Sequence, residues 1–246
     1  MTWDDLDREI WYWAERGRTA TLWWRDDDAV RPCPALDRVL DLSAGFAVPV
    51  ALAVIPGSAS ADLGPHLARH PTVSVLQHGF THANHAAPGE DWEEYGHRRS
   101  RVDRLAELAE GRARLAGHAR FVPALVPPWN RFPDDLLADL PAIGLIGISA
   151  WGARSQSVGG VRRANVHVDV MDWSSNRFAG TGQVLDRLVG HLADRRDGRV
   201  DADEPTGVMT HHSFHDEECW AFLGALFQRT RPRPGVRWLA ADEVFT

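Results

Sequence analysis

The chain has 246 residues, of which 44% are hydrophobic and 25% are charged. This is enough apolar material for one large core, so we expect a single domain spanning residues 1–246. The formal net charge of −7 argues against nucleic acid and anionic membranes as partners, since both would repel the protein. Two cysteines, Cys33 and Cys219, are too few for a disulfide framework or a four-cysteine zinc site.

The amino-terminal segment, residues 1–17, shows no targeting pattern. It carries acidic residues where a signal peptide would carry lysine or arginine followed by an apolar run. No stretch of the sequence approaches the length of a transmembrane helix. We therefore expect a cytoplasmic protein that acts on a small molecule and has neither nucleic acid nor a membrane as partner.

Along the chain, short apolar runs alternate with longer helical patterns. Several of the runs, such as residues 48–55, are nearly continuous in Val, Ile, Leu and Ala, which is typical of parallel strands buried on both faces. A strand followed by a helix, repeated seven or eight times, predicts a (β/α) barrel with mainly parallel strands, and an open doubly wound sheet is the alternative. Helices are predicted at 3–16, 35–46, 98–116, 182–195 and 217–229, and strands at 20–25, 48–55, 72–77, 119–126, 143–149, 164–169, 206–211 and, more weakly, 236–239.

Polar residues gather where five of these predicted strands end. The loops that follow the strands of a barrel converge on one face, and that face carries the chemistry. We therefore expect a functional site built from all five clusters. They lie at 25–29, 78–82, 127–131, 169–173 and 210–212.

One of these clusters has the composition of a metal site. His78 and His82 can reach one ion across a single turn, and Gly79 allows the chain to bend sharply out of the strand. Imidazole and carboxylate groups suit Zn²⁺ or a similar divalent ion, and a catalytic zinc site uses three protein ligands. Two histidines and one carboxylate from residues 26–28 supply that number. A histidine pair alone is usually a surface feature, but the acidic cluster on the same face favours one divalent metal ion.

In their order and spacing, these residues resemble the motifs of the NodB-homology polysaccharide deacetylases, carbohydrate esterase family 4. The resemblance covers residues 20 to about 215 and implies a distorted (β/α) barrel of NodB type. It also implies a hydrolase that uses a divalent ion, commonly zinc, and an activated water to remove an acetyl group from an acetylated sugar or small glycan. The matching residues are Asp27-Asp28, His78 and His82, Pro128-Trp129, Asp169 with Asp172-Trp173, and His211.

The resemblance implies a role for each aspartate of the first motif. Asp28 is expected to bind the metal with the two histidines, and Asp27 is expected to be the catalytic base. A small residue follows the aspartate pair in the family, and Ala29 fills that place here. The pair Asp26-Asp27 is the competing register.

The late histidine and the aromatic residues of the resemblance are expected to act on the substrate. His211 is the expected acid, and His212 is the alternative acid and otherwise a substrate-binding residue. Pro128, Trp129 and Trp173 are expected to bind the substrate. The backbone N–H of the Trp129 position helps to hold the oxyanion in the family, and Trp173 is expected to line the acetyl pocket.

The sequence departs from the family at Val126, where the family has an arginine that steadies the catalytic aspartate. Arg131 or Arg25 is expected to replace it, with Arg131 counted among the catalytic residues. Asp172 is expected to orient a charged partner, whereas Asp169 could simply cap the end of a strand. Two other functions stay open: a metal amidohydrolase acting on a non-sugar amide or cyclic imide, and a catalytically silent barrel that binds carbohydrate.

Overall fold

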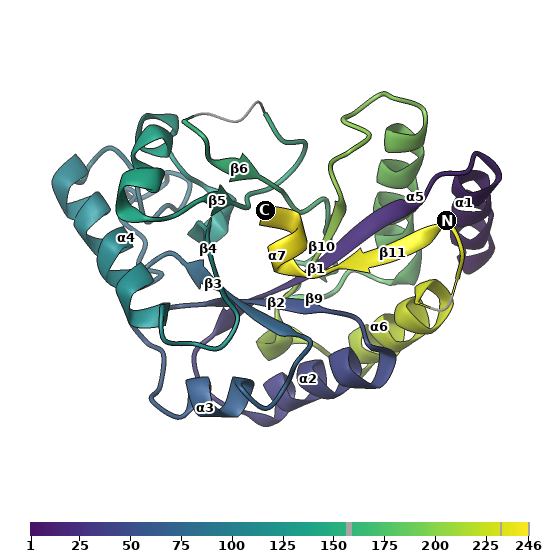
Figure 1. The fold of residues 1–246 in the computed structure, drawn as a ribbon, viewed down its shortest axis with the longest axis horizontal. Helices are drawn as coiled ribbons and strands as arrows, with labels where there is room; N and C mark the ends of the chain where they lie inside the picture. Colours follow the sequence, from purple (N-terminus) through teal and green to yellow (C-terminus); the bar gives the residue numbers. More distant parts are fainter. Residues whose placement is uncertain (156–158, 232, 246) are drawn as a thin grey trace.

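The computed structural model describes residues 1–155, 159–231 and 233–245, and a nine-stranded sheet forms its centre (Figure 1). Its strands pair in the order β6-β5-β4-β3-β2-β1-β10-β7, with β11 beside β1, and every pairing is parallel. The strands are β1 (Ala20–Ala29), β2 (Val50–Val54), β3 (Val73–His78), β4 (Phe121–Val126), β5 (Gly147–Ile148), β6 (Arg162–Arg163), β7 (Val168–Asp169), β10 (Thr206–Thr210) and β11 (Val236–Leu239).

The segment from β6 to β7 curls this sheet into a barrel because it changes its neighbour halfway along. The N–H of Ala164 donates to the carbonyl of Ile148 on one side, whereas the N–H of His167 donates to the carbonyl of Gly207 in β10 on the other. An open doubly wound sheet would not join its two edges in this way. The expected distorted (β/α) barrel is confirmed.

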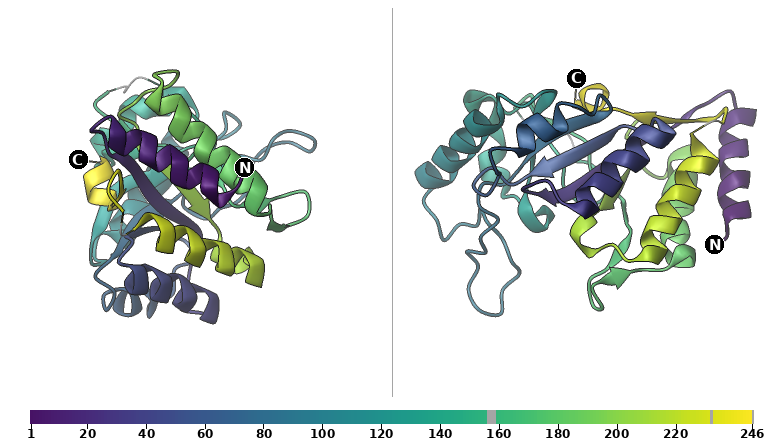
Figure 2. Two further views of the ribbon diagram at one scale, coloured as in Figure 1. Left: turned by 90° about the vertical axis from the view of Figure 1, so that its right-hand side faces the viewer. Right: turned by 90° about the horizontal axis from the view of Figure 1, so that it is seen from below.

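Helices cover the outside of the sheet, as Figures 1 and 2 show. All five predicted helices are present with ends that differ from the prediction by no more than a few residues.

Within the described part of the chain, no helix is both long and apolar enough to cross a lipid bilayer. Cys33 and Cys219 are free thiols. The helices are α1 (Trp3–Glu15), α2 (Pro34–Phe46), α3 (Leu63–Leu67), α4 (Arg101–Leu115), α5 (Thr181–Arg196), α6 (Glu217–Thr230) and α7 (Ala241–Phe245).

The prediction differs from the structure mainly between residues 128 and 178. The strand expected at 143–149 is short because a 3₁₀ helix, η2 (Asp134–Ile143), runs up to Gly144, whose φ of +79° turns the chain back. The strand expected at 164–169 is interrupted by its change of neighbour. Short elements without a strong periodic pattern were not predicted: α3, α7, η1 (Pro128–Asn130), η3 (His212–Phe214) and the hairpin β8 (Met171–Asp172) with β9 (Arg177–Phe178).

Alternation along β1 explains how the barrel positions a polar site above an apolar base. Leu22 and Trp24 face outward into the core beneath the helices, whereas Trp23 faces the interior, where it packs edge-on against Phe245 of α7 at 5.8 Å. Further along the same inward face come Arg25 and Asp27. In the right-hand view of Figure 2, the loop after β3 and the β8-β9 hairpin project from the end opposite α7.

Candidate active site

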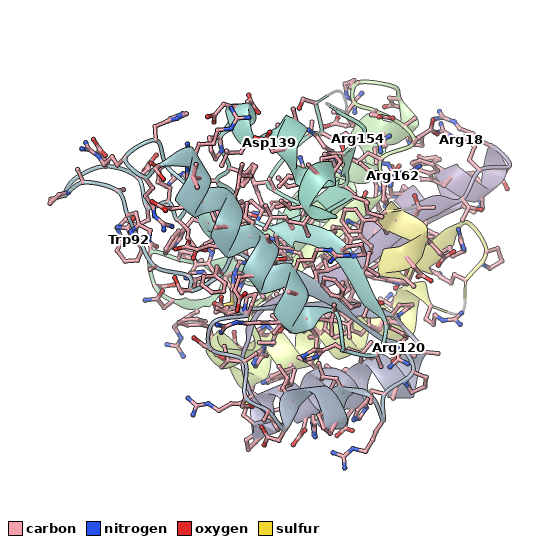
Figure 3. The ribbon with its side chains drawn as sticks, turned by 60° about the vertical axis from the view of Figure 1, so that its left-hand side comes forward. Arg18, Trp92, Arg120, Asp139, Arg154 and Arg162 are labelled. Carbon is pink, nitrogen blue, oxygen red and sulfur yellow. The ribbon has the colours of Figure 1, made fainter. Side chains whose placement is uncertain are left out.

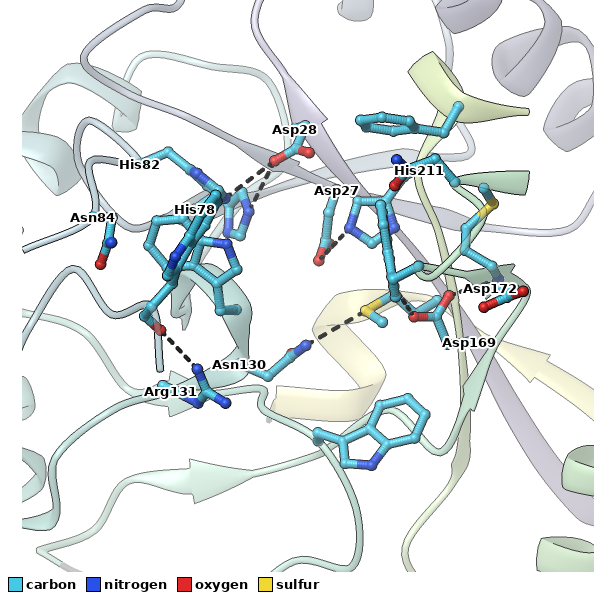
Figure 4. A pocket seen from close by; sticks show the side chains of 18 of the residues that line it. Asp27, Asp28, His78, His82, Asn84, Asn130, Arg131, Asp169, Asp172 and His211 are labelled. Atoms are coloured by element: carbon cyan, nitrogen blue, oxygen red, sulfur yellow. Dashed lines mark hydrogen bonds and ion pairs between the residues drawn. The ribbon is translucent and has the colours of Figure 1, made fainter. Parts of the chain in front are cut away.

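A pocket of about 1110 Å³ opens at the carboxyl ends of the strands (Figure 4). It draws its lining from β1, β3, β10 and the loops after β3, β4 and β7, so the polar clusters that are far apart in the sequence meet in one place. Pro128 and His212 are buried outside its lining. The expected site residues that do line it are Asp27, Asp28, His78, His82, Trp129, Arg131, Asp172, Trp173 and His211.

The end of β1 contains a β-bulge that turns two consecutive aspartates into the pocket. The register with β2 shifts between Asp26 and Ala29, and Asp28 has a φ of +71°. In a regular strand Asp27 and Asp28 would face opposite sides of the sheet. With the extra residue both line the pocket, while Asp26 faces outward, where its carboxylate accepts a hydrogen bond from the Thr210 hydroxyl.

Asp28, His78 and His82 form a group whose ligand atoms all lie within 4.8 Å of one another. Asp28 Oδ1 is 3.2 Å from Nε2 of His78 and 3.5 Å from Nε2 of His82, and it is buried without a hydrogen-bond partner among the described residues. Nδ1 of His78 lies 2.9 Å from the carbonyl oxygen of Val126. Donation of the Nδ1 proton to that carbonyl leaves the Nε2 lone pair facing Asp28. Two nitrogens and an unpaired oxygen that converge in this way fit a divalent cation.

The electrostatics of these three residues also favour a positive ion. Burial alone would raise the pKa of Asp28, but the neighbouring histidines His78, His211 and His82 lower it below its ordinary value. Burial would lower the pKa of His78, yet Asp28 and Asp27 raise it overall. The pKa of His82 is lowered by burial and by His78. The group therefore holds an ionised carboxylate, which is the form that binds a cation.

Asp27 is held by an arginine of its own strand. Nε and Nη2 of Arg25 donate to the two carboxylate oxygens of Asp27 at 2.8 and 2.9 Å, a bidentate pair that is almost fully buried. Arg25 is fixed in turn by hydrogen bonds to Ser149 Oγ at 2.7 Å and to Asn130 Oδ1 at 2.8 Å. Val126 stands where the family has an arginine, and Arg25 or Arg131 was expected to take the role of that arginine. Of these two, Arg25 contacts Asp27.

The other expected arginine, Arg131, does not reach Asp27. Its Nη1 donates to the carbonyl of Trp92 at 3.0 Å, and its Nη2 lies 2.8 Å from Asp91. Because it follows η1 at the rim of the pocket, its side chain extends to the loop that carries Trp92 (Figure 4). The interior space beneath Asp27 is already filled by Arg25. The expectation that Arg131 acts on the catalytic aspartate is therefore corrected.

His211 faces Asp27 across the pocket. Its Nε2 is 3.9 Å from Asp27 Oδ2, and its ring packs edge-on against Trp173 with centroids 4.7 Å apart. The indole N–H of Trp173 donates to Asp169 Oδ2 at 2.7 Å. Burial raises the pKa of Asp169, and the nearby His211 opposes that rise. Asp169 does cap the strand end through the N–H of Met171, but its second oxygen positions the aromatic wall beside His211.

Two expected site residues have other surroundings. The carboxylate of Asp172 accepts hydrogen bonds from the hydroxyls of Ser174 at 2.7 Å and Ser175 at 2.9 Å, so it braces the turn of the β8-β9 hairpin rather than orienting a charged partner. His212 begins η3, shortly after β10, and its Nδ1 lies 2.5 Å from Asp26 Oδ1 outside the pocket. Although burial opposes it, Asp26 raises the pKa of His212 to about 9. His212 therefore does not reach a substrate in the pocket.

Aromatic side chains lie close to the candidate metal-binding group, Asp28, His78 and His82. Trp129 has a φ of +54°, which is strained for a residue with a side chain, and its ring lies 4.5 Å from that of His82. Trp92 packs edge-on against Trp129 at 5.6 Å and is 58% exposed on the projecting loop after β3 (Figure 3). Trp151 and Phe214 are exposed at other points of the lining. Sequence reasoning missed Trp92 and Trp151, because both lie on loops without a motif.

No protein-family model and no curated protein matches the sequence. Solved structures do match it. A candidate polysaccharide deacetylase from Mycobacterium smegmatis is 16% identical with a TM-score of 0.63, over 93% of this chain and 89% of that one. A family 4 carbohydrate esterase from Streptomyces lividans is 13% identical with a TM-score of 0.57, over 88% and 90%.

A third match is a mutant of a family 4 pseudoenzyme with restored enzymatic activity, 14% identical with a TM-score of 0.56, over 93% of this chain and 68% of that one. The chain has the fold of the NodB-type deacetylases. At such low identity the likeness concerns the fold, so the function has to be argued from the residues of the pocket.

Proposed function

We propose that the protein is a metal-dependent hydrolase that removes an acetyl group from an acetylated sugar or small glycan. The observation that carries this proposal is the convergence of Asp28 Oδ1, His78 Nε2 and His82 Nε2 in the pocket, where the buried oxygen has no hydrogen-bond partner among the described residues. Such an arrangement is costly unless a cation completes it. Asp27 and His211 line the same pocket, where a reacting acetyl group would sit.

Asp28, His78 and His82 would hold one divalent ion, and two imidazoles with one carboxylate suit zinc. Once bound, the ion would activate a water molecule and polarise the acetyl carbonyl. The burial of His78 and its hydrogen bond to the Val126 carbonyl support a ligand that is oriented before the ion arrives.

Asp27 is the proposed general base. Its bidentate pairing with Arg25 fixes the position of the carboxylate, whose ionised form can accept a proton from the attacking water. Because the arginine occupies the interior side of the carboxylate, the base has a fixed direction toward the pocket. Arg25 is thus proposed to steady Asp27 in place of the family arginine.

His211 is the proposed general acid. An imidazole can donate a proton to the leaving sugar nitrogen or oxygen near neutral pH. The edge-on contact with Trp173 fixes the ring plane, and the Trp173 indole is itself anchored by Asp169. Trp173, anchored by Asp169, is proposed to line the acetyl group, and the backbone N–H of Trp129 to help hold the oxyanion.

A sugar is the proposed substrate because the pocket is large and its wall is aromatic. The indole faces of Trp92, Trp129 and Trp151 offer wide, flat apolar surfaces on which a sugar ring can stack. The wider set of polar groups in the lining, including Asn84, Asn130 and Asn176, can bond to hydroxyl groups.

The test is to measure acetate released from N-acetylated and O-acetylated sugar oligomers, beside ring opening of cyclic imides, by protein loaded with zinc. We expect acetate from at least one sugar, lost after chelation and restored by added zinc. Ring opening without acetate release would identify the amidohydrolase instead. Sugar binding without any turnover would identify a silent binding barrel.

A further inference from the structure

Glu94 lies in the loop between β3 and α4 and is completely buried, although nothing in the proposed mechanism uses it. Its carboxylate faces the turn that joins His78 to His82. Oε1 accepts the backbone N–H groups of Thr81 at 2.7 Å and of His82 at 3.0 Å, and also the Thr81 hydroxyl at 3.0 Å. Oε2 accepts the backbone N–H of Phe80 at 3.1 Å. Three consecutive backbone N–H groups therefore converge on one carboxylate.

This convergence exists because the turn has an unusual backbone. Gly79 has a φ of +52° and His82 a φ of +60°, so the chain leaves β3 sharply and takes a left-handed conformation at a metal-binding residue. Left-handed backbone is unfavourable for a residue with a side chain and persists only where its surroundings impose it. Successive N–H groups that point to one side form a concave site for an anion, and Glu94 fills it.

The fit of Glu94 to this turn is close. A Cβ atom added to Gly79 would lie 2.0 Å from Glu94 Oε2 and 2.7 Å from a ring carbon of Pro128. Any side chain at position 79 would displace either the carboxylate or the proline. Pro128, expected to bind substrate, therefore contributes by packing beneath the turn, and the three residues form one support for the His82 backbone.

We propose that Glu94 is a positioning residue for the metal centre: it holds the turn in the conformation that directs the imidazole of His82 toward Asp28. It does not touch the ion and acts only through His82. The inference rests on the proposed function only insofar as Asp28, His78 and His82 bind a divalent ion. If Glu94 merely stabilised the loop, its removal would change the metal affinity by the same factor whether or not the His82 imidazole was present.

The experiment is a double-mutant cycle on metal affinity, measured without substrate. Metal-free wild type, Glu94→Gln, His82→Ala and the double variant are titrated with Co²⁺, whose visible absorption also reports ligand geometry. Glu94→Gln keeps the size of the side chain but places an amide donor among the N–H groups. Loss of a group that orients a metal ligand typically weakens metal binding about 10- to 100-fold. We expect that loss in Glu94→Gln and a changed Co²⁺ spectrum.

In the His82→Ala background, we expect Glu94→Gln to change the affinity less than about threefold, because the residue through which it acts is gone. The matched control is Glu90→Gln on the same loop, where an exposed carboxylate pairs with Arg98 and accepts the N–H of Ala87. This control should bind Co²⁺ like the wild type. If Glu94→Gln does not fold, as judged by circular dichroism, Glu94→Asp takes its place in the same cycle.

An unchanged affinity in the Glu94 variant would overturn the proposal, and so would an equal loss with and without His82. These results differ from a failure of the proposed function. Absence of acetate release, with the coupling to His82 intact, would remove the deacetylase and leave the role of Glu94 standing. Acetate release with no effect of Glu94 on metal affinity would remove the positioning role of Glu94 and leave the deacetylase standing.

Discussion

Asp26 and Asp27 are adjacent and buried, and each is paired with a cationic group, yet they face opposite sides of the barrel wall. Asp27 faces the interior, where Arg25 holds it at the edge of the pocket. Asp26 faces outward, where His212 and Thr210 enclose it. The two carboxylates have similar chemistry, so their different uses follow from which one a substrate can reach. Function at this strand end is decided by orientation rather than by residue type.

The largest effect is expected for Asp27→Asn. The amide fits the same space and leaves the metal-binding group intact, but it cannot take a proton. General-base catalysis contributes about 10²- to 10⁴-fold, so kcat should fall by that factor, roughly 3 to 5 kcal/mol of barrier. Bound metal, measured by atomic absorption, should stay at the wild-type level. A variant with wild-type kcat would remove Asp27 from the chemistry.

The companion variant, Asp26→Asn, should change stability instead of turnover. Removing one partner of a buried pair leaves His212 buried without its carboxylate, a loss of about 3 kcal/mol in the free energy of unfolding. Acetate release per folded molecule should stay within about threefold of wild type. Urea unfolding of the metal-free protein measures the first quantity, with Asp41→Asn on the exposed face of α2 as control. A large loss of kcat with unchanged stability would reverse the assignment of the two aspartates.

The stability difference between wild type and Asp26→Asn should also depend on pH. Asp26 raises the pKa of His212 to about 9 against an ordinary 6.5, so the stabilisation is complete below pH 6.5 and is lost as the pH rises through 9. The pKa of Asp26 itself is lowered: burial alone would raise it, but His212 more than offsets this. The contribution should therefore also disappear as the pH falls below about 4. A difference that stays constant from pH 5 to 10 would show that the pair is not ionic.

Arg25→Gln and Arg131→Gln test which of the two arginines supports Asp27. Loss of Arg25 leaves Asp27 without its bidentate partner and its fixed orientation, so kcat should fall about 10- to 100-fold. Arg131→Gln should leave kcat nearly unchanged and raise KM only a few-fold, because Arg131 supports the Trp92 loop. The reverse pattern would restore Arg131 as the partner of the base.

Trp92→Ala should have a small effect that is confined to substrate binding. Trp92 is half-exposed on a loop and packs against Trp129 without contacting the metal-binding group. Its loss should raise KM for a sugar oligomer about 3- to 10-fold and leave kcat nearly unchanged. A short acetylated substrate that does not reach Trp92 is the control and should show no change. An equal effect on both substrates would mean that Trp92 supports the fold rather than binding sugar.

The sequence predicted the barrel and the meeting of its polar clusters, because both follow from local patterns. Apolar runs and helical periodicity are properties of neighbouring residues, and parallel strands bring their carboxyl ends together without further information. The pairing of Arg25 with Asp27 was within reach, since residues two apart in a strand share a face. Arg131 was favoured because it lies beside the motif that lacks its arginine.

Other parts of the site depend on geometry that no pattern encodes. The bulge at Asp28 is a register shift between two strands, so the sequence could not tell which of three successive aspartates faces inward. In the β8-β9 hairpin, Asp172 accepts a hydrogen bond from a serine of the same hairpin. Asp169, by contrast, accepts the indole N–H of Trp173. Glu94 lies 12 residues after His82 on the same loop. Only the folded turn shows that its carboxylate accepts hydrogen bonds from three consecutive backbone N–H groups.

The most direct test of the account is to measure divalent metal per chain and acetate release side by side in wild type and Asp28→Asn, both purified without chelator. Asp28 supplies the anionic ligand of the proposed centre, and its amide cannot balance the charge of the ion. We predict about one ion per wild-type chain with acetate release, and little metal with little acetate release in the variant. Acetate release that survives in Asp28→Asn without bound metal, or a wild type that releases acetate after complete removal of metal, would contradict the account.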